Sequence, residues 1–275
     1  MSDPRELYIE LIKKTLTFTL WDESRLFKPS EMDPHPFYKK WVVDSIVGHL
    51  SKQGRRIMEP VQRQDREREL GRDWPTLAHT MIGRKRLDNL DYCLRTVLSE
   101  QVPGDLIETG VWRGGACIFM RAVLKAYEVT DRVVWVADSF AGLPEPDPQK
   151  YPEDAHDRHH IFDELRISRD EVEDAFRRYS LMDEQVRFLV GWFKDTLPVA
   201  PIKTLAVLRL DGDMYESTWD ALLHLYPKLS PGGYCIIDDY ILKNCRSAVH
   251  DYRRKHGIED EIVDIDGTGA FWRKA

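Results

Sequence analysis

Two pairs of acidic residues follow two short apolar runs in the last third of the sequence. Asp211 and Asp213 end one run, and Asp238 and Asp239 end the next. If both runs are neighbouring parallel strands, the four carboxylates gather at one edge of a sheet, where ligands bind. Unpaired carboxylates at that density repel one another, and a hard divalent cation such as Mg²⁺ or Mn²⁺ would relieve the conflict. The alternative is a set of helix caps and solvent-facing acids.

A glycine-rich segment earlier in the chain is suited to close approach of a ligand. Residues 108–115 read Glu-Thr-Gly-Val-Trp-Arg-Gly-Gly after a short apolar run. Gly110 permits a tight turn, and Gly114 and Gly115 would open a helix whose N–H groups favour an anion. The spacing ExGxxxGG differs from GxGxxG, so an NAD(P)-dependent oxidoreductase is the weaker alternative. A tight turn without any ligand is the other interpretation.

Two more predicted strand ends carry residues suited to a nucleoside. Asp138 lies 30 residues beyond Glu108 and ends an apolar run. An acid at this place can accept both ribose hydroxyls, although a helix N-cap would use the same residue. Gly191 and Trp192 end the following run. They would form the wall of an adenine slot, or they pack into the core.

The elements that must position these residues alternate between two periods. Helical spacing of apolar residues predicts helices near 5–20, 87–98, 117–124, 172–179, 219–226 and 248–252. Apolar runs predict strands at 106–107, 133–137, 186–190, 205–210 and 234–237, with short ones near 261–265 and 270–272. This alternation indicates an α/β fold with a Rossmann-like parallel sheet covered on both faces. The glycines of 267–269 predict an antiparallel hairpin at its edge, and 230–233 are read as the turn before a strand.

Residues 1–75 are predicted to be a helical extension, and residues 76–275 the main domain. The segment 22–75 mixes prolines, aromatic residues and a charged run at 63–72, which is read as a solvated helix face or a loose linker. No strand is predicted there. Its exposed aromatic residues must cover something, so we expect it to roof a substrate pocket and to join a homodimer or higher oligomer.

Bulk composition excludes several classes of protein. The formal charge of −7 argues against a nucleic-acid binder, and no apolar run is long enough for a membrane span. The charged N-terminal segment does not resemble a signal peptide. Four scattered cysteines without a CxxC pair are expected to be buried free thiols, which suits the cytoplasm.

A polar loop, 141–162, lies between predicted elements and is a candidate lid. A histidine of this loop, or His79 elsewhere, would be able to touch an acceptor or assist a proton transfer. A solvated loop histidine is the more common situation. The loop residues concerned are His156, His159 and His160.

Long runs of this sequence resemble the macrocin O-methyltransferase family, which includes mycinamicin and novobiocin sugar O-methyltransferases. The resemblance covers about residues 70–275 and part of the N-terminal helix. The matching runs are DWPTLAHTMIG (73–83), IETGVWRGGACIF (107–119), VWVADSF (134–140), GWFKDTLP (191–198), LRLDGDMYEST (208–218) and IIDDY (236–240).

The resemblance implies a class I methyltransferase fold, S-adenosylmethionine as cofactor, and Mg²⁺-dependent transfer to a sugar hydroxyl. The acceptor would be an antibiotic deoxysugar or a free or lipid-linked saccharide, with a phenol or catechol as the alternative. By motif, Glu108 and Gly110 hold the methionine end, Asp138 the ribose, and Gly191 with Trp192 the adenine. Asp211 is also implied as the general base. The remaining implied positions are Met81, Trp112, Ala116, Ser139 and Asp211 for the cofactor, and Asp211, Asp238 and Asp239 for the metal.

Overall fold

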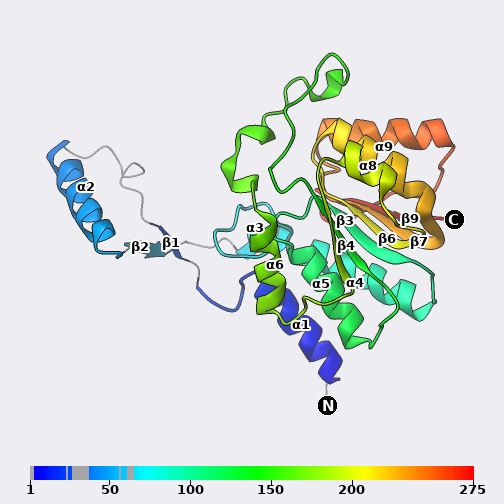
Figure 1. Ribbon diagram of the computed structural model, residues 1–275, viewed down its shortest axis with the longest axis horizontal. Helices are drawn as coiled ribbons and strands as arrows, with labels where there is room; N and C mark the ends of the chain where they lie inside the picture. Colours follow the sequence, from blue (N-terminus) through cyan, green and yellow to red (C-terminus); the bar gives the residue numbers. More distant parts are fainter. Residues whose placement is uncertain (1–2, 23, 27–36, 56, 61–64) are drawn as a thin grey trace.

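The computed structural model describes residues 3–22, 24–26, 37–55, 57–60 and 65–275. Its main body is a twisted sheet with helices on both faces (Figure 1). The sheet strands in chain order are β3 Asp105–Thr109, β4 Val134–Asp138, β5 Val186–Val190, β6 Leu205–Leu210, β7 Leu229–Ile237, β8 Val263–Asp264 and β9 Ala270–Arg273.

The sheet has the order β5-β4-β3-β6-β7-β9-β8, and its first five strands run parallel. The chain leaves β3 for β4 on one side and later returns to pair β6 on the other side of β3. This reversal creates a crevice at the carboxyl ends of the central strands, which is where α/β proteins bind ligands. The predicted α/β fold with a parallel sheet is therefore confirmed.

Helices cover the two faces in separate groups. One face carries α4, α5 and α6, with α1 packed on α5, and the other face carries α8 packed on α9 (Figure 1). Their bounds are α1 Pro4–Leu16, α4 Arg84–Ser99, α5 Gly115–Ala126, α6 Arg169–Arg178, α8 Tyr215–Leu225 and α9 Lys243–His256. A short α7, Phe193–Thr196, follows β5.

Each face of the sheet has its own apolar core, because alternate strand residues point to opposite sides. Leu106 and Val136 pack under α4 and α5, whereas Ile107 and Leu208 pack under α8 and α9. Arg209 of β6 is a buried exception on the α4 side. Burial on both faces explains why the strands read as continuous apolar runs.

The C-terminal edge is antiparallel, as predicted, with β9 pairing β7 and β8 pairing β9. The interpretation of residues 230–233 as a turn before the strand was wrong, since β7 already begins at Leu229. The Gly232 N–H donates to the Lys274 carbonyl at 2.7 Å, and the Lys274 N–H donates to Gly233 at 2.9 Å. Pairing with the end of the chain therefore keeps this Gly-rich stretch within β7, although Gly232 has φ +80° and the pairing with β6 shifts register across it.

The N-terminal region differs from its prediction in two ways. A two-stranded ribbon of β1 Ser24–Leu26 and β2 Met58–Pro60 exists where no strand was expected, and α2 Phe37–Lys52 projects with it from the main body (Figure 1). The described part of the charged run forms α3 Asp65–Leu70, so of the two interpretations the helix is confirmed and the loose linker is wrong. Asp65, Arg66 and Glu69 are exposed on this helix, as predicted for a solvated face, but Arg68 is buried.

Candidate active site

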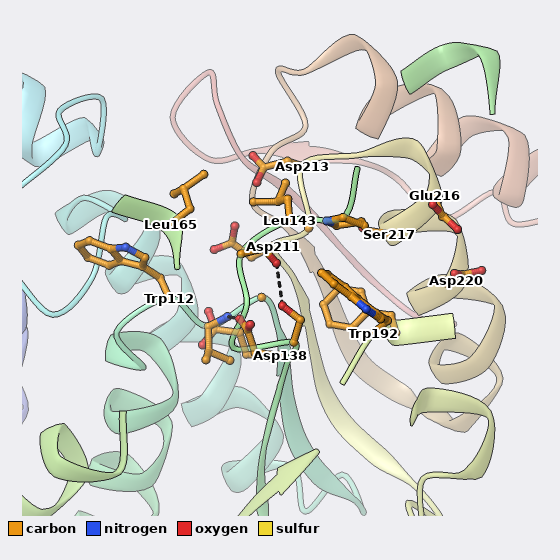
Figure 2. A pocket seen from close by; sticks show the side chains of 18 of the residues that line it. Trp112, Asp138, Leu143, Leu165, Trp192, Asp211, Asp213, Glu216, Ser217 and Asp220 are labelled. Carbon is orange, nitrogen blue, oxygen red and sulfur yellow. Dashed lines mark hydrogen bonds between the residues drawn. The ribbon is translucent and has the colours of Figure 1, made fainter. Parts of the chain in front are cut away.

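A single continuous pocket opens at the carboxyl ends of the parallel strands, with about 950 Å³ of empty space including its mouth. Its walls come from the loops after β3, β4, β5 and β6 and from the first turns of α8. Trp112 and Leu165 lie on one side and Trp192 and Asp220 on the other, with Asp211 between them (Figure 2). The predicted location of the chemistry, at the strand ends, matches this pocket.

Nearly all residues assigned to the cofactor from the sequence lie on this pocket. Ala116 does not line it, because it faces the apolar core from the first turn of α5. The predicted residues that do line it are Met81, Glu108, Gly110, Trp112, Asp138, Ser139, Gly191, Trp192 and Asp211.

The glycine loop is built for close approach of backbone to backbone. Gly110 has φ +84°, and a Cβ there would lie 1.6 Å from the carbonyl oxygen of Asp211. Gly115 would place a Cβ 2.4 Å from the carbonyl oxygen of His79. The loop therefore links the end of β3 to the end of β6 and to the segment before α4.

Asp138 uses its carboxylate to fix the loops beside the pocket. Oδ2 accepts the Val111 N–H at 2.8 Å, and Oδ1 accepts the Phe140 N–H at 2.7 Å. The residue does not cap a helix N-terminus, since an irregular loop follows it. Burial raises the pKa of Asp138, and the two backbone N–H groups oppose that rise.

Glu108 is buried at the end of β3 between a cation and a thiol. Its carboxylate pairs with the Arg209 guanidinium and accepts a hydrogen bond from Cys117 Sγ at 3.0 Å. Burial raises the pKa of Glu108 to about 7 against the pull of Arg209. All four cysteines are buried and free, as predicted.

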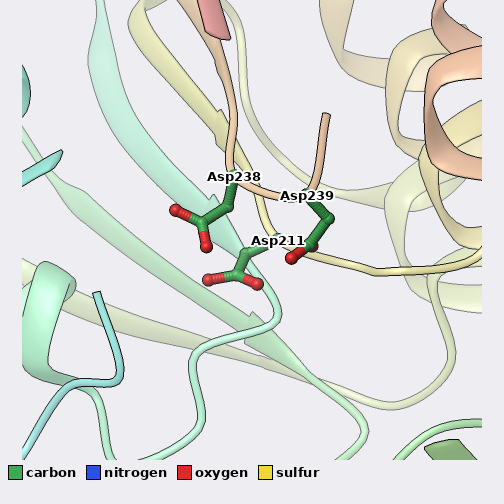
Figure 3. A group of neighbouring side chains, drawn as sticks. All are labelled: Asp211, Asp238 and Asp239. Atoms are coloured by element: carbon green, nitrogen blue, oxygen red, sulfur yellow. The ribbon is translucent and has the colours of Figure 1, made fainter. Parts of the chain in front are cut away.

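The acids of two adjacent strands meet at one point. Asp211 follows β6, and Asp238 and Asp239 follow β7, which pairs with β6. One carboxylate oxygen from each lies within 4.8 Å of the others, and Figure 3 shows the three groups converging. Asp213, which also lines the pocket, donates its N–H to Asp239 Oδ2 at 3.1 Å.

The expectation that these carboxylates are unpaired was wrong for two of them. Arg209 pairs with Asp238 and with Asp211, the latter at 2.8 Å, and Arg86 of α4 pairs with the other oxygen of Asp238. Both arginines are buried. An arginine within an apolar strand must find acidic partners inside the protein, and that rule would have revealed the pairing.

Asp239 remains the least neutralised member of the cluster. Burial raises its pKa well above the ordinary value, and the charges of Asp213, Asp211 and Asp238 raise it further. Within the part of the chain that the structure describes, Asp211 and Asp238 form ion pairs with arginine, whereas Asp239 forms none. Such a set of carboxylate oxygens is the donor chemistry that Mg²⁺ prefers. The residues present therefore fit a hard divalent cation.

The loop 141–162 is fastened to the first turns of two helices. The buried Asp154 accepts the N–H of Tyr215 at 2.7 Å and that of Glu216 at 3.0 Å, both at the start of α8. It also accepts a hydrogen bond from the side chain of Asn244 in α9. Sequence reasoning missed Asp154, although an acid facing helix N-termini is a recognised stabilising arrangement.

The four histidines have different surroundings. His159 pairs with Asp157 at 3.0 Å, and the hydrogen bond that its ring donates to the Asp157 carboxylate, together with the charge of Asp213, raises the pKa of His159. His79 is bonded to the Tyr179 hydroxyl at 2.9 Å, away from the pocket wall. His156 is exposed and His160 half-buried, and neither is part of the pocket wall.

Two acidic side chains on α8 were also missed. Glu216 and Asp220 line the pocket beside Trp192 and are largely buried, with Lys194 nearby (Figure 2). Their spacing of four residues places them on one face of the helix that follows β6. That spacing, directly after the acidic strand end, was the available signal.

A seven-stranded sheet with this order, with a glycine loop after its first strand and an acid at the end of its second, is typical of the class I, S-adenosylmethionine-dependent methyltransferase fold. Comparison with known proteins agrees. The family described as macrocin-O-methyltransferase (TylF) matches residues 5–274, and the chain belongs to this family. The sequence-based recognition of the family is thus confirmed, and the oxidoreductase alternative has no support.

The relatives include O-methyltransferases with named substrates. The chain is 52% identical over 272 residues to the 8-demethyl-8-(2,3-dimethoxy-alpha-L-rhamnosyl)-tetracenomycin-C 4'-O-methyltransferase of Streptomyces olivaceus, covering 98% of this chain and 94% of that one. It is 58% identical over 211 residues to the mycinamicin III 3''-O-methyltransferase of Micromonospora griseorubida, covering 76% and 83%. The solved O-methyltransferase NovP is 47% identical, with 98% and 99% covered and a TM-score of 0.83.

Within the described part of the chain, none of the helices is both long and apolar enough to cross a membrane.

Proposed function

We propose that this enzyme transfers a methyl group from S-adenosylmethionine to a sugar hydroxyl of a glycoside, with Mg²⁺ bound at Asp211, Asp238 and Asp239. The observation that carries the proposal is the convergence of these three carboxylates beside the pocket that the glycine loop lines. The sugar acceptor is supported by the relative from Streptomyces olivaceus, whose name specifies a rhamnosyl group on tetracenomycin C as part of its substrate.

The cofactor is assigned to the part of the pocket formed by the first three strand ends. Glu108 and Gly110 would hold its amino acid end, and Asp138 its ribose hydroxyls. Gly191 and Trp192 would form the wall against the adenine, with the other pocket-lining candidates Met81, Trp112 and Ser139 around them. Ala116 is left out of the assignment, because it does not reach the pocket.

The residues of the chain have distinct tasks in this reaction. The cofactor supplies an activated methyl group, and the metal, when bound, supplies a positive charge that orients and acidifies an acceptor hydroxyl. Arg209 bonds Asp211 Oδ2, so Oδ1 is assigned the proton of that hydroxyl. Burial and the charge of Asp238 raise the pKa of Asp211 to about 6, which suits a proton acceptor.

The acceptor side of the pocket combines acidic and apolar walls. Leu143 and Leu165 line the pocket from the segment after β4, and Asp213 lines it from the loop after β6 (Figure 2). A saccharide presents both hydroxyl groups and apolar ring faces, so such a mixed surface suits it. If the sugar ring carries a second oxygen beside the hydroxyl to be methylated, both oxygens would bind to the site and hold the ring in place.

We also propose that the enzyme is a homodimer or higher oligomer of the cytoplasm, in which residues 1–75, whose α2 projects from its own main body, cover the acceptor pocket of another copy. On α2, the side chains of Trp41, Val42 and Ile46 are 69%, 44% and 51% exposed. Large apolar side chains on a projecting helix favour burial against a second copy. The four free cysteines suit a reducing compartment.

The decisive experiment uses purified enzyme with methyl-labelled S-adenosylmethionine and a panel of glycosides, phenols and catechols. Label is expected in a glycoside, lost in EDTA and restored by Mg²⁺. Transfer to phenols alone would reject the sugar acceptor, and full turnover in EDTA would reject the metal.

A further inference from the structure

Two buried arginines connect α3 with the segment at the start of α4. From α3, Arg68 Nη2 donates to the carbonyl oxygen of Met81 at 2.7 Å and to that of Ile82 at 3.2 Å. Met81 and Ile82 line the pocket, directly before α4 begins. The backbone of one pocket wall is therefore held by a guanidinium from the segment that precedes the main domain.

Arg86 makes the reciprocal connection. Its Nη2 donates to the carbonyl oxygens of Leu70 and Gly71 at 3.2 and 2.8 Å, at the end of α3. Its Nη1 bonds the carboxylate of Asp238, and its Nε lies 3.2 Å from Asp266 in the C-terminal hairpin. One side chain thus joins α3, a proposed metal ligand and the edge of the sheet.

The backbones at this crossing touch closely enough to exclude side chains. A Cβ on Gly71 would lie 2.3 Å from the Gly83 nitrogen and 2.5 Å from Arg86 Nη2. A Cβ on Gly83 would lie 2.1 Å from the Glu69 carbonyl oxygen. The two segments are therefore fitted to one another, and the arginines bridge them in both directions.

We propose that Arg68 and Arg86 are positioning residues for the methyl-transfer site: Arg68 holds the pocket wall of residues 80–82, and Arg86 holds the Asp238 carboxylate. This inference rests on the proposed function, because it assigns the wall to the cofactor and Asp238 to the metal. Its consequence is that residues 65–72 are part of the active site. Neither arginine touches substrate, and each acts through the groups that it orients.

The fork shape of the guanidinium is the property on which the proposal depends. Arginine donates several N–H groups in fixed directions, so Arg86 can bond Asp238 and two carbonyls together. Lysine keeps the charge but offers a compact head on a shorter reach. An arginine-to-lysine exchange therefore removes the bridge while leaving the electrostatic potential at the acid cluster nearly constant.

The test uses the full chain with Arg68→Lys and Arg86→Lys. The dissociation constant of S-adenosylhomocysteine is measured by calorimetry without metal, and that of Mn²⁺ by electron paramagnetic resonance without nucleoside. We expect Arg68→Lys to raise the dissociation constant of S-adenosylhomocysteine about fivefold and to leave that of Mn²⁺ unchanged. We expect Arg86→Lys to raise the dissociation constant of Mn²⁺ about tenfold.

A matched control is Arg84→Lys, on the same helix but paired with Glu10 and Asp88 away from the pocket. It should change neither constant. If an Arg86 variant does not fold, Asp266→Asn removes the charged partner of Arg86 and should weaken Mn²⁺ about threefold. Ligand affinities within twofold of wild type in folded variants would overturn the proposal. A wild-type chain that binds neither ligand would instead reject the proposed function.

Discussion

The Cα atom of Gly110 lies against the carbonyl oxygen of Asp211, leaving no room for a methyl group between the glycine loop and the acid cluster. The proposed cofactor side and the proposed metal side of the site thus share one backbone contact. A shift of either strand end would therefore displace the other directly.

Gly110→Ala should therefore disturb binding as well as stability. A Cβ at 1.6 Å cannot be accommodated, and a φ of +84° is strained for alanine. We expect S-adenosylhomocysteine binding to disappear in calorimetry and stability to fall by more than about 2 kcal/mol. Gly257→Ala is the control, since its φ is +63° with open space around it. That variant should lose only about 1 kcal/mol and bind normally.

The two neighbouring aspartates after β7 should respond differently to amide substitution. Asp239→Asn should weaken Mn²⁺ by at least about tenfold and cost less than about 1 kcal/mol of stability, because it leaves no cation unpaired. Asp238→Asn should also cost about 3 kcal/mol, because Arg86 and Arg209 lose a buried partner. Chemical denaturation and Mn²⁺ titration measure the two effects, and equal stability losses would contradict the assignment.

Asp138 offers a test of cofactor recognition. Asp138→Ala should raise the dissociation constant of S-adenosylhomocysteine by an amount equivalent to about 1–3 kcal/mol, since charged hydrogen bonds are lost. Asp138→Asn retains an oxygen for one of the two N–H groups and should lose less. Calorimetry decides, and an unchanged constant in both variants would restrict Asp138 to holding the Val111 and Phe140 backbones.

The His159–Asp157 pair predicts a pH-dependent contribution to stability. The pKa of His159 is raised and that of Asp157 lowered in the folded protein. The histidine contribution is present below its unfolded pKa of about 6.5 and is lost as pH rises through the raised value. The pair is partly exposed, so His159→Gln should cost about 0.5 kcal/mol at pH 6 and less at pH 9. Urea unfolding at both values checks this, and a larger cost at pH 9 would contradict it.

Assembly is best tested through α2. Truncation before residue 72 would also remove Ile9 and Leu16 of α1, which belong to the core of the main body. The double variant Trp41→Glu with Ile46→Glu leaves α1 in place and should yield a monomer where the wild type is an oligomer. Light scattering measures the mass, and an unchanged mass in both proteins would remove α2 from the interface.

Sequence patterns located the sheet and most of the site for a physical reason. Strands buried on both faces must be apolar along their length, so their ends, and the acids at those ends, are visible in the sequence. The same patterns gave Gly110, because a ligand-binding turn needs a residue free of a Cβ. The pocket location followed from the sheet class.

The missed features depend on contacts between distant segments. Arg209 interrupted an apolar run, and its partners lie on β3 and β7 as well as at the end of its own strand. The buried Arg68 donates hydrogen bonds to two carbonyl groups that lie more than ten residues further along the chain. The three-residue strands β1 and β2 are too short to show any periodicity. Such features require knowledge of which elements meet.

The position of Arg209 constrains how this enzyme can diverge. Its guanidinium joins Glu108 of β3 to Asp211 and Asp238, which directly follow β6 and β7, and it is almost completely buried. Replacing any one of the four residues would leave an unpaired charge in the interior, so a single substitution at any of these positions lowers the stability of the fold. Substitutions in the loops that line the pocket can change the acceptor preference, whereas these four residues must be inherited together or exchanged together.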